Sequence, residues 1–212
     1  MINSSNGTQG NREAPDSFMT IAEAHDPETV ATNRKALEFL SRQSKPLFAL
    51  LDTARDNEIL PLLAESGCDY VCLYGGTFAE TMSDYAPYLV AVPAESPFLR
   101  TLLDLGWGES WGIYLTTAVE LNVLRRHLRR FLSVKLPDGR QVLFRFYDPR
   151  VLRTFLPTCT SEELQRFFGP ISAFYLESGT GDAVLSYGLT AATGGDGANE
   201  PAKLLQLSWK LG

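Results

Sequence analysis

Histidine is almost absent from this chain, and cysteine is scarce. The 212 residues include two histidines, His25 and His127, and three cysteines. Because histidine is the commonest general base, a Ser–His–Asp or Cys–His catalytic site is poorly supplied. Cys68 and Cys72 would stand about 13 Å apart along one strand, which is too far for them to bind one metal ion together. With Cys159 they make an odd number of cysteines, which argues against a disulfide framework. We therefore expect core thiols, no catalytic residue, no cofactor and no metal site.

Long apolar runs are absent as well. The longest, such as 47–51 and 88–93, are far below the roughly 20 residues that a membrane-spanning helix needs. Residues 1–10 have neither the charged region nor the apolar region of a cleaved secretion signal. These absences predict a cytoplasmic protein without a membrane span.

What the chain does have is an alternation of strand-like and helix-like segments. Apolar runs of strand length at 47–52, 69–74, 88–92 and 111–115 alternate with helical patterns at 27–44, 56–66 and 96–106. This alternation predicts an α/β fold with a mixed sheet of βαβ-like units and flanking helices. An Asp-Gly turn between 133–136 and 141–147 predicts an antiparallel hairpin that joins the sheet.

The remaining pattern predicts the domain organisation. Short helices at 150–155 and 161–168, the second capped by Ser161, precede strands at 172–177 and 183–189, which we expect to form a smaller helical and C-terminal lobe. Polar residues 1–26 are predicted to be a mobile leader, and 27–190 to be one domain. Residues 191–212 are predicted to be a flexible glycine-rich linker with a possible final strand.

Positive charge is concentrated in one part of an otherwise acidic chain. The net charge is −6, yet residues 125–153 hold nine of the 19 lysines and arginines and only two acidic residues. A helix is predicted at 120–132, with Arg126, Arg129 and Arg130 opposite its apolar face. Nucleic acid is disfavoured as a partner, because the whole chain is acidic and has no recognisable nucleic-acid module. A solvated helix face and a docking surface for an acidic or polar protein both remain open.

The densest group of aromatic and charged residues is Phe144–Arg150. As a strand, it would carry bulky side chains on both faces, so Arg145 should be partly buried and paired with a carboxylate or carbonyl group. One interpretation is a structural Arg–Asp network that fixes the corner at Pro149. The other is a protein-binding corner, because arginine and tyrosine are frequent at interface hot spots.

A third candidate is the turn from Tyr74 to Thr77, between a strand and a helix. Phosphate groups bind at such turns, and Asp52 at a strand end would assist. The turn nevertheless lacks the spacing of the known phosphate-binding motifs. A turn with Thr77 as helix cap, and an Asp52 that caps a nearby turn, are favoured instead.

The order of several short motifs resembles that of the type VI secretion effector chaperones, also called adaptor proteins, over about residues 47–177. The segments that carry the resemblance are Phe48–Asp52, Ala86–Val90, Gly106–Gly108, Trp111–Gly112, His127–Phe131, Arg145–Leu152, Phe155–Pro157 and Phe167–Ile171.

This resemblance implies a non-enzymatic protein that binds a cognate effector and the VgrG spike protein. We select Arg145, Tyr147, Asp148 and Arg150, with the helix arginines, as candidate partner-binding residues. Two alternatives are a toxin-binding immunity protein and a small α/β enzyme that binds a phosphorylated ligand at the 74–77 turn.

Overall fold

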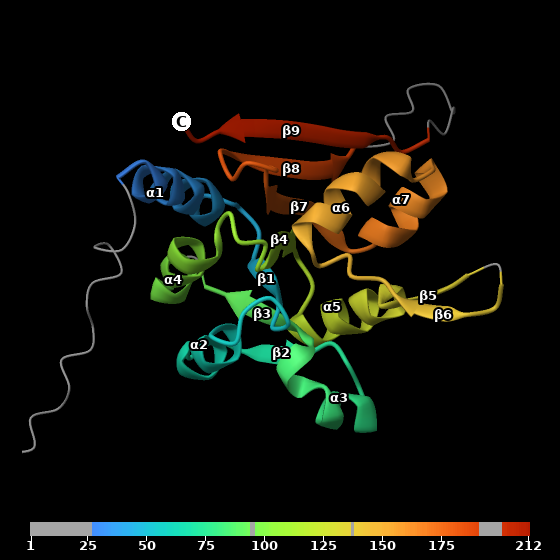
Figure 1. Ribbon diagram of the computed structural model, residues 1–212. Coiled ribbons are helices and arrows are strands. Elements are labelled where there is room, and N and C mark those ends of the chain that lie inside the picture. Colours follow the sequence, from blue (N-terminus) through green and yellow to red (C-terminus); the bar gives the residue numbers. More distant parts are fainter. Residues whose placement is uncertain (1–26, 94–95, 137, 191–200) are drawn as a thin grey trace, which may run out of the picture.

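A seven-stranded sheet forms the centre of the protein (Figure 1). The computed structural model describes residues 27–93, 96–136, 138–190 and 201–212, so the predicted leader and linker lie outside the described residues. The strand order is β2-β3-β1-β4-β7-β8-β9. The strands are β1 (Leu47–Asp52), β2 (Tyr70–Cys72), β3 (Pro87–Val92), β4 (Gly112–Thr117), β7 (Ile171–Glu177), β8 (Ala183–Leu189) and β9 (Leu204–Lys210).

Helices cover both faces of this sheet. Figure 1 shows α1 and α4 on one side and α5, α6 and α7 on the other. Every residue of β1 and β4 is buried, as the unbroken apolar runs predict for strands covered on both faces. The α-helices are α1 (Pro27–Ser41), α2 (Ile59–Glu65), α3 (Thr77–Thr81), α4 (Pro97–Gly106), α5 (Leu121–Leu128), α6 (Pro149–Phe155) and α7 (Ser161–Phe168), and the short 3₁₀ helices are η2 (Ser83–Tyr85), η3 (Arg129–Phe131) and η4 (Leu156–Thr158).

The predicted α/β class is confirmed, but the sheet is not mixed. Every strand pairing among the described residues is antiparallel. The βαβ-like unit β1–α2–β2 exists, and its two strands run in the same direction. However, β3 lies between them and pairs antiparallel with both. The alternating pattern indicates the order of strands and helices along the chain. Which strands become neighbours in the sheet depends on contacts between residues that are distant in sequence.

The predicted hairpin forms, but it does not join the main sheet. Strands β5 (Ser133–Lys135) and β6 (Gln141–Leu143) make a separate two-stranded sheet. The prediction that β6 extends to Tyr147 is also wrong. Phe146 and Tyr147 are neighbours in sequence and are both buried, which the alternation of side chains along a strand does not allow. The reason is that the strand ends at Leu143, after which the chain turns inward and enters α6.

The C-terminal strands extend the main sheet and do not form a lobe of their own. Strand β7 pairs with β4, and β8 and β9 continue outward from it, so the final strand predicted from the sequence is confirmed. Phe167 and Phe168 of α7 pack on Phe174 of β7, with ring centroids 5.4 and 5.0 Å apart. The cap of α7 is Thr160, not Ser161, and it forms a capping box with Glu163. The three cysteines are free and pack, partly buried, against the core.

Candidate functional site

Arg145 joins the motif corner, which we define as residues Arg145–Arg150, to the end of the central strand β1. Its guanidinium donates to Oδ2 of Asp52, whose side chain is buried. The backbone N–H of Ala54 donates to Oδ1 of Asp52 at 3.2 Å, so this carboxylate also caps the turn after β1, as predicted. The Arg145 side chain remains 43% exposed. The prediction of a partly buried arginine with a carboxylate partner is confirmed.

A second ion pair closes the corner at the start of α6. Oδ1 of Asp148 accepts the backbone N–H of Arg150 at 2.9 Å, which caps the helix, and Nε of Arg150 at 2.9 Å. Nη2 of Arg150 donates to Oδ2 at 2.6 Å. Burial raises the pKa of Asp148, but the hydrogen bonds and charge of Arg150 outweigh it and hold this pKa below its ordinary value. Arg150 is thus a structural partner of Asp148, although half of its side chain is exposed.

Tyr147 holds the corner against the turn at 74–77. Its side chain is buried and hydrogen-bonds with the side chain of Tyr74. Burial is the main cause that raises the pKa of Tyr147, and this hydrogen bond raises it further. Arg125 of α5 fixes the same turn, because its Nε donates to the carbonyl of Cys72 at 2.8 Å and its Nη2 to that of Tyr74 at 3.1 Å. The motif corner therefore contacts both parts of the alternative phosphate site: Arg145 pairs with Asp52, and Tyr147 hydrogen-bonds with Tyr74 of the 74–77 turn.

The turn itself differs from the predicted one. The cap position of α3 is Gly76, with φ +63°, and no side chain caps this helix, so the prediction that Thr77 is the cap is wrong. The guanidinium of Arg129 lies against Gly75, where an added Cβ would stand 2.2 Å from Nη2. The turn is thus held by two arginines of the α5 and η3 region.

The three candidate arginines near the end of α5 differ in their surroundings. All three are exposed. Nη2 of Arg130 lies 2.8 Å from Nδ1 of His127 and its guanidinium carbon 5.7 Å from the ring of Phe131. Within the described part of the chain, Arg126 makes no hydrogen bond or ion pair, and it is the freest of the candidates to meet a partner.

His127 is a buried structural residue that the sequence reasoning left without a role. Its Nε2 lies 2.8 Å from the carbonyl oxygen of Phe167 in α7. Because Arg130 donates to Nδ1, the proton of the neutral ring is on Nε2 and is donated to Phe167. Burial lowers the pKa of His127, and the charge of Arg130 lowers it further. The sequence signal that indicates this role is the position of His127 on the apolar face of the helix.

An apolar hollow between the β5–β6 hairpin and α7 was also missed. Its volume is about 610 Å³. We call it the hairpin groove. Val134, Val142 and Leu143 of the hairpin are 42%, 37% and 55% exposed, so their apolar surface is open to solvent. The groove is lined by Phe131, Val134, Val142, Leu143, Phe144, Phe155 and Phe167, with Arg130, Lys135, Arg166 and Glu163 among the other lining residues.

A comparison with models of protein families gives one match. The model described as "Domain of unknown function (DUF4123)" matches residues 47–166. The chain belongs to the DUF4123 family. No curated protein and no solved structure matches it. The DUF4123 segment contains the motif corner, the arginines of α5 and most of the residues that line the hairpin groove.

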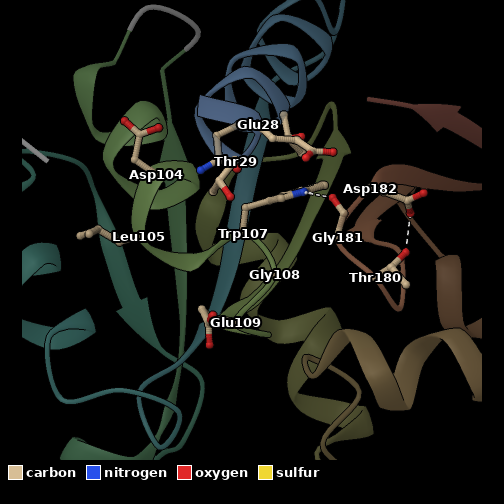
Figure 2. A pocket seen from close by; sticks show the side chains of 12 residues that line it. Glu28, Thr29, Asp104, Leu105, Trp107, Gly108, Glu109, Thr180, Gly181 and Asp182 are labelled. Atoms are coloured by element: carbon tan, nitrogen blue, oxygen red, sulfur yellow. Dashed lines mark hydrogen bonds between the residues drawn. The ribbon is translucent and has the colours of Figure 1, made fainter. Parts of the chain in front are cut away.

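The Gly-Trp-Gly motif of the DUF4123 segment has a structural role. Nε1 of Trp107 donates to the carbonyl of Gly181 in the β7–β8 turn at 2.7 Å (Figure 2). The buried carboxylate of Glu177 accepts the backbone N–H groups of Gly108 at 2.6 Å and Ser110 at 3.1 Å. Burial raises the pKa of Glu177. A cavity of about 430 Å³ beside Trp107 is lined by four acidic residues, Glu28, Asp104, Glu109 and Asp182.

The described residues include neither a membrane-spanning helix nor a metal-binding cluster. None of their helices combines the length and the apolar character needed to span a bilayer. Nor do they contain a group of three or more histidine, cysteine, aspartate or glutamate side chains placed to hold a metal ion.

Proposed function

We propose that this DUF4123 protein is a non-catalytic adaptor that binds a cognate type VI secretion effector in the cytoplasm and helps to load it onto the VgrG spike. The type VI assignment is supported by the sequence resemblance, which is strongest at Arg145–Leu152. The observation that carries the binding role is the hairpin groove, an apolar hollow beside exposed arginines.

The groove has the chemistry of a polypeptide-binding surface. Interfaces combine an apolar centre, enriched in aromatic residues, with a polar rim. Here Phe144 and Phe155 pack edge to face at 4.7 Å inside the groove. Arg130, Lys135 and Arg166 add positive charge. A partner segment with apolar side chains flanked by acidic residues fits this arrangement, since its charge complements the rim.

The roles of the candidate residues follow from their contacts. Arg145 and Arg150 each pair with a buried aspartate, and Tyr147 is itself buried, so we assign them to shaping the corner. We assign direct partner contact to the exposed Arg126, Arg130 and Leu143.

The test is co-purification with the products of the genes adjacent to this one, including an effector and VgrG. Arg126→Glu and Leu143→Asp are expected to weaken effector binding by about tenfold or more, as loss of an interface hot spot does. The matched control is Arg100→Glu, because Arg100 is an exposed residue of α4 on the other side of the sheet. This variant should bind the effector normally. If no adjacent product binds, the adaptor proposal is wrong.

The same experiment separates the adaptor from an immunity protein. An immunity protein inhibits the toxic activity of its partner, whereas an adaptor of the proposed kind stabilises an effector fragment and also binds the spike. Inhibition of the toxin without spike binding would assign the chain to immunity. A thermal shift with nucleotides and magnesium would instead support the enzyme alternative at 74–77.

A further inference from the structure

The cavity of about 430 Å³ beside Trp107 is bordered by the N-terminal end of α1, the C-terminal end of α4 and the β7–β8 turn (Figure 2). We call it the acidic cavity. Its carboxylates come from different parts of the chain: Glu28 of α1, Asp104 of α4, Glu109 of the loop after α4 and Asp182 of the β7–β8 turn. The described residues that line it include no lysine, arginine or histidine.

Negative charge is in excess around the acidic cavity even after the neighbouring cations are counted. Nζ of Lys210 pairs with Oδ2 of Asp182 at 2.5 Å, and Arg55 donates to the backbone carbonyl of Glu109 at 3.1 Å. Two positive charges thus stand beside four carboxylates. The C-terminal end of α4 adds the partial negative charge of its carbonyl groups, whereas the N-terminal end of α1 offsets part of the charge of Glu28. The acidic cavity therefore attracts cations.

A buried asparagine gives the acidic cavity a second feature that calls for a ligand. Asn33 is 3% exposed and lines the cavity from the same face of α1 as Thr29 and Thr32, which precede it by four residues and by one. Its Oδ1 atom is buried and accepts no hydrogen bond from any described residue. An unpaired buried acceptor is rare and destabilises a folded protein. A hydrogen-bond donor on a bound molecule would satisfy it.

The arrangement of the carboxylates favours an elongated cation over a metal ion. No three acidic, histidine or cysteine side chains of the described ranges are placed to hold one metal ion. A ligand that meets more than one of these carboxylates must therefore carry its positive groups apart. Figure 2 shows Trp107 between Asp104 and Asp182, where its ring can pack against the apolar part of such a ligand and attract a nearby cationic group. The cavity volume is within the range of sites that hold small molecules, about 300–1,000 Å³.

We propose that the acidic cavity binds a linear aliphatic polyamine. Its ammonium groups donate to Oδ1 of Asn33 and to the carboxylates of Asp104 and Glu109, and its methylene groups pack beside Trp107. An ammonium group has donors and no acceptor, which suits a cavity that offers carboxylate oxygens and one unpaired amide oxygen. The cavity is bordered by α1 and α4, on the side of the sheet opposite α7 and the hairpin groove (Figure 1). The proposal does not rest on the type VI assignment.

The test is isothermal titration of the whole chain with spermidine at low salt. Spermidine should bind at one saturable site, and octane-1,8-diol, an uncharged chain of similar length, should not bind. Magnesium chloride should weaken spermidine binding no more than sodium chloride of the same ionic strength, because the cavity has no metal-binding group among its described residues. In NMR spectra, spermidine should shift the indole N–H signal of Trp107 and leave that of Trp209, outside the cavity, unchanged.

Asn33→Leu is the decisive variant. Leucine is similar in size to asparagine but has no hydrogen-bonding group, so the substitution removes the unpaired acceptor. Spermidine binding should weaken by about tenfold or more, as expected for loss of a hydrogen bond to a charged group. The Tm of the variant without spermidine should not fall, because Oδ1 has no described partner to lose.

Glu109→Gln tests the charge of the acidic cavity and also serves if Asn33→Leu fails to fold. Glu109 is exposed, so loss of its charge should weaken spermidine binding by about two- to fivefold. The matched control is Glu162→Gln, because Glu162 is an exposed residue of α7 on the other side of the sheet. This variant makes the same change in net charge and should bind spermidine normally.

Three results would overturn the proposal. The first is absence of saturable spermidine binding, or binding that leaves the Trp107 signal unchanged. The second is equal affinity of the wild type and Asn33→Leu, or equal weakening by Glu109→Gln and Glu162→Gln, which would reduce binding to net charge. The third is tighter binding of the acetylated, amidated peptide Lys-Ala-Lys-Ala-Lys than of spermidine, which would assign the cavity to a basic protein segment. None of these results depends on whether an effector binds the hairpin groove.

Discussion

Replacing Arg145 with alanine tests whether the motif corner stabilises the fold. The substitution leaves the Asp52 carboxylate buried, with a side chain 1% exposed, and with the N–H of Ala54 as its remaining donor. Removing one member of a fully buried ion pair costs about 3–5 kcal/mol. Here the Arg145 side chain is 43% exposed, so water replaces part of the lost interaction. We therefore expect a loss of about 1–3 kcal/mol in the free energy of unfolding.

The assay is urea unfolding followed by circular dichroism, with a thermal melt beside it. For a chain of this size, the expected loss lowers Tm by about 3–9 °C. The matched control is Arg140→Ala. Arg140 also pairs with an aspartate, Asp138, but these side chains are 74% and 49% exposed. Removal of this surface pair should leave the unfolding midpoint unchanged.

A double-mutant cycle with Asp52→Asn gives the result that would refute this reasoning. If Arg145 acts through the buried carboxylate, the double variant should lose less stability than the two single losses added together, with a coupling of about 0.5–3 kcal/mol. Additive losses would mean that Arg145 stabilises the corner in some other way. A stability unchanged by Arg145→Ala would remove the structural role altogether.

Two further predictions concern residues that lie away from the corner. Burial lowers the pKa of His127, so the folded chain resists protonation of this ring. The neutral His127 therefore contributes stability above the pKa of about 6.5 that histidine has in the unfolded chain. Below that pH the free energy of unfolding should fall by up to about 1.4 kcal/mol per pH unit. His127→Gln should flatten the stability curve in that range relative to wild type, and equal slopes in the two proteins would contradict the assignment. Gly112→Ala should cost about 3 kcal/mol in the free energy of unfolding, because the new Cβ would lie 2.2 Å from the backbone oxygen of Leu50. Gly188→Ala, whose Cβ meets nothing closer than 3.7 Å, is the control for the loss of a strand glycine, and equal unfolding midpoints would refute the steric argument.

Local signals in the sequence predicted the elements well where the whole signal lies within one segment. The helix at 96–106 is an example, because Ser96 precedes Pro97 and the hydroxyl of Ser96 accepts the N–H of Phe98 at 3.2 Å. The arginine-bearing helix also formed where its apolar periodicity placed it, as α5 followed by η3.

The features that failed depend on contacts distant in sequence. Arg145 required a carboxylate partner, but Asp52 lies 93 residues earlier, and no local pattern selects it over the other acidic residues. The end of β6 was missed for a similar reason. The alternation at 141–147 continues past Leu143, while Phe146 and Tyr147 both turn into a core whose other members come from elsewhere in the chain. The insertion of β3 between β1 and β2 likewise has no signal in the order of elements.

The positions of the motif residues limit what a family resemblance says about recognition. Tyr147 and Asp148 are buried, and Arg145 and Arg150 are paired with buried aspartates, so the same residues are required to fold the corner whatever partner is bound. The family match also ends at residue 166, before β7, although β7 pairs with β4 and joins β8 and β9 to the rest of the sheet. Selectivity among partners should therefore depend on exposed residues that the motif does not include, such as Arg126 and Leu143. Exchanging those surfaces between two members of the family should exchange their partners, whereas exchanging the motif corner alone should change only stability.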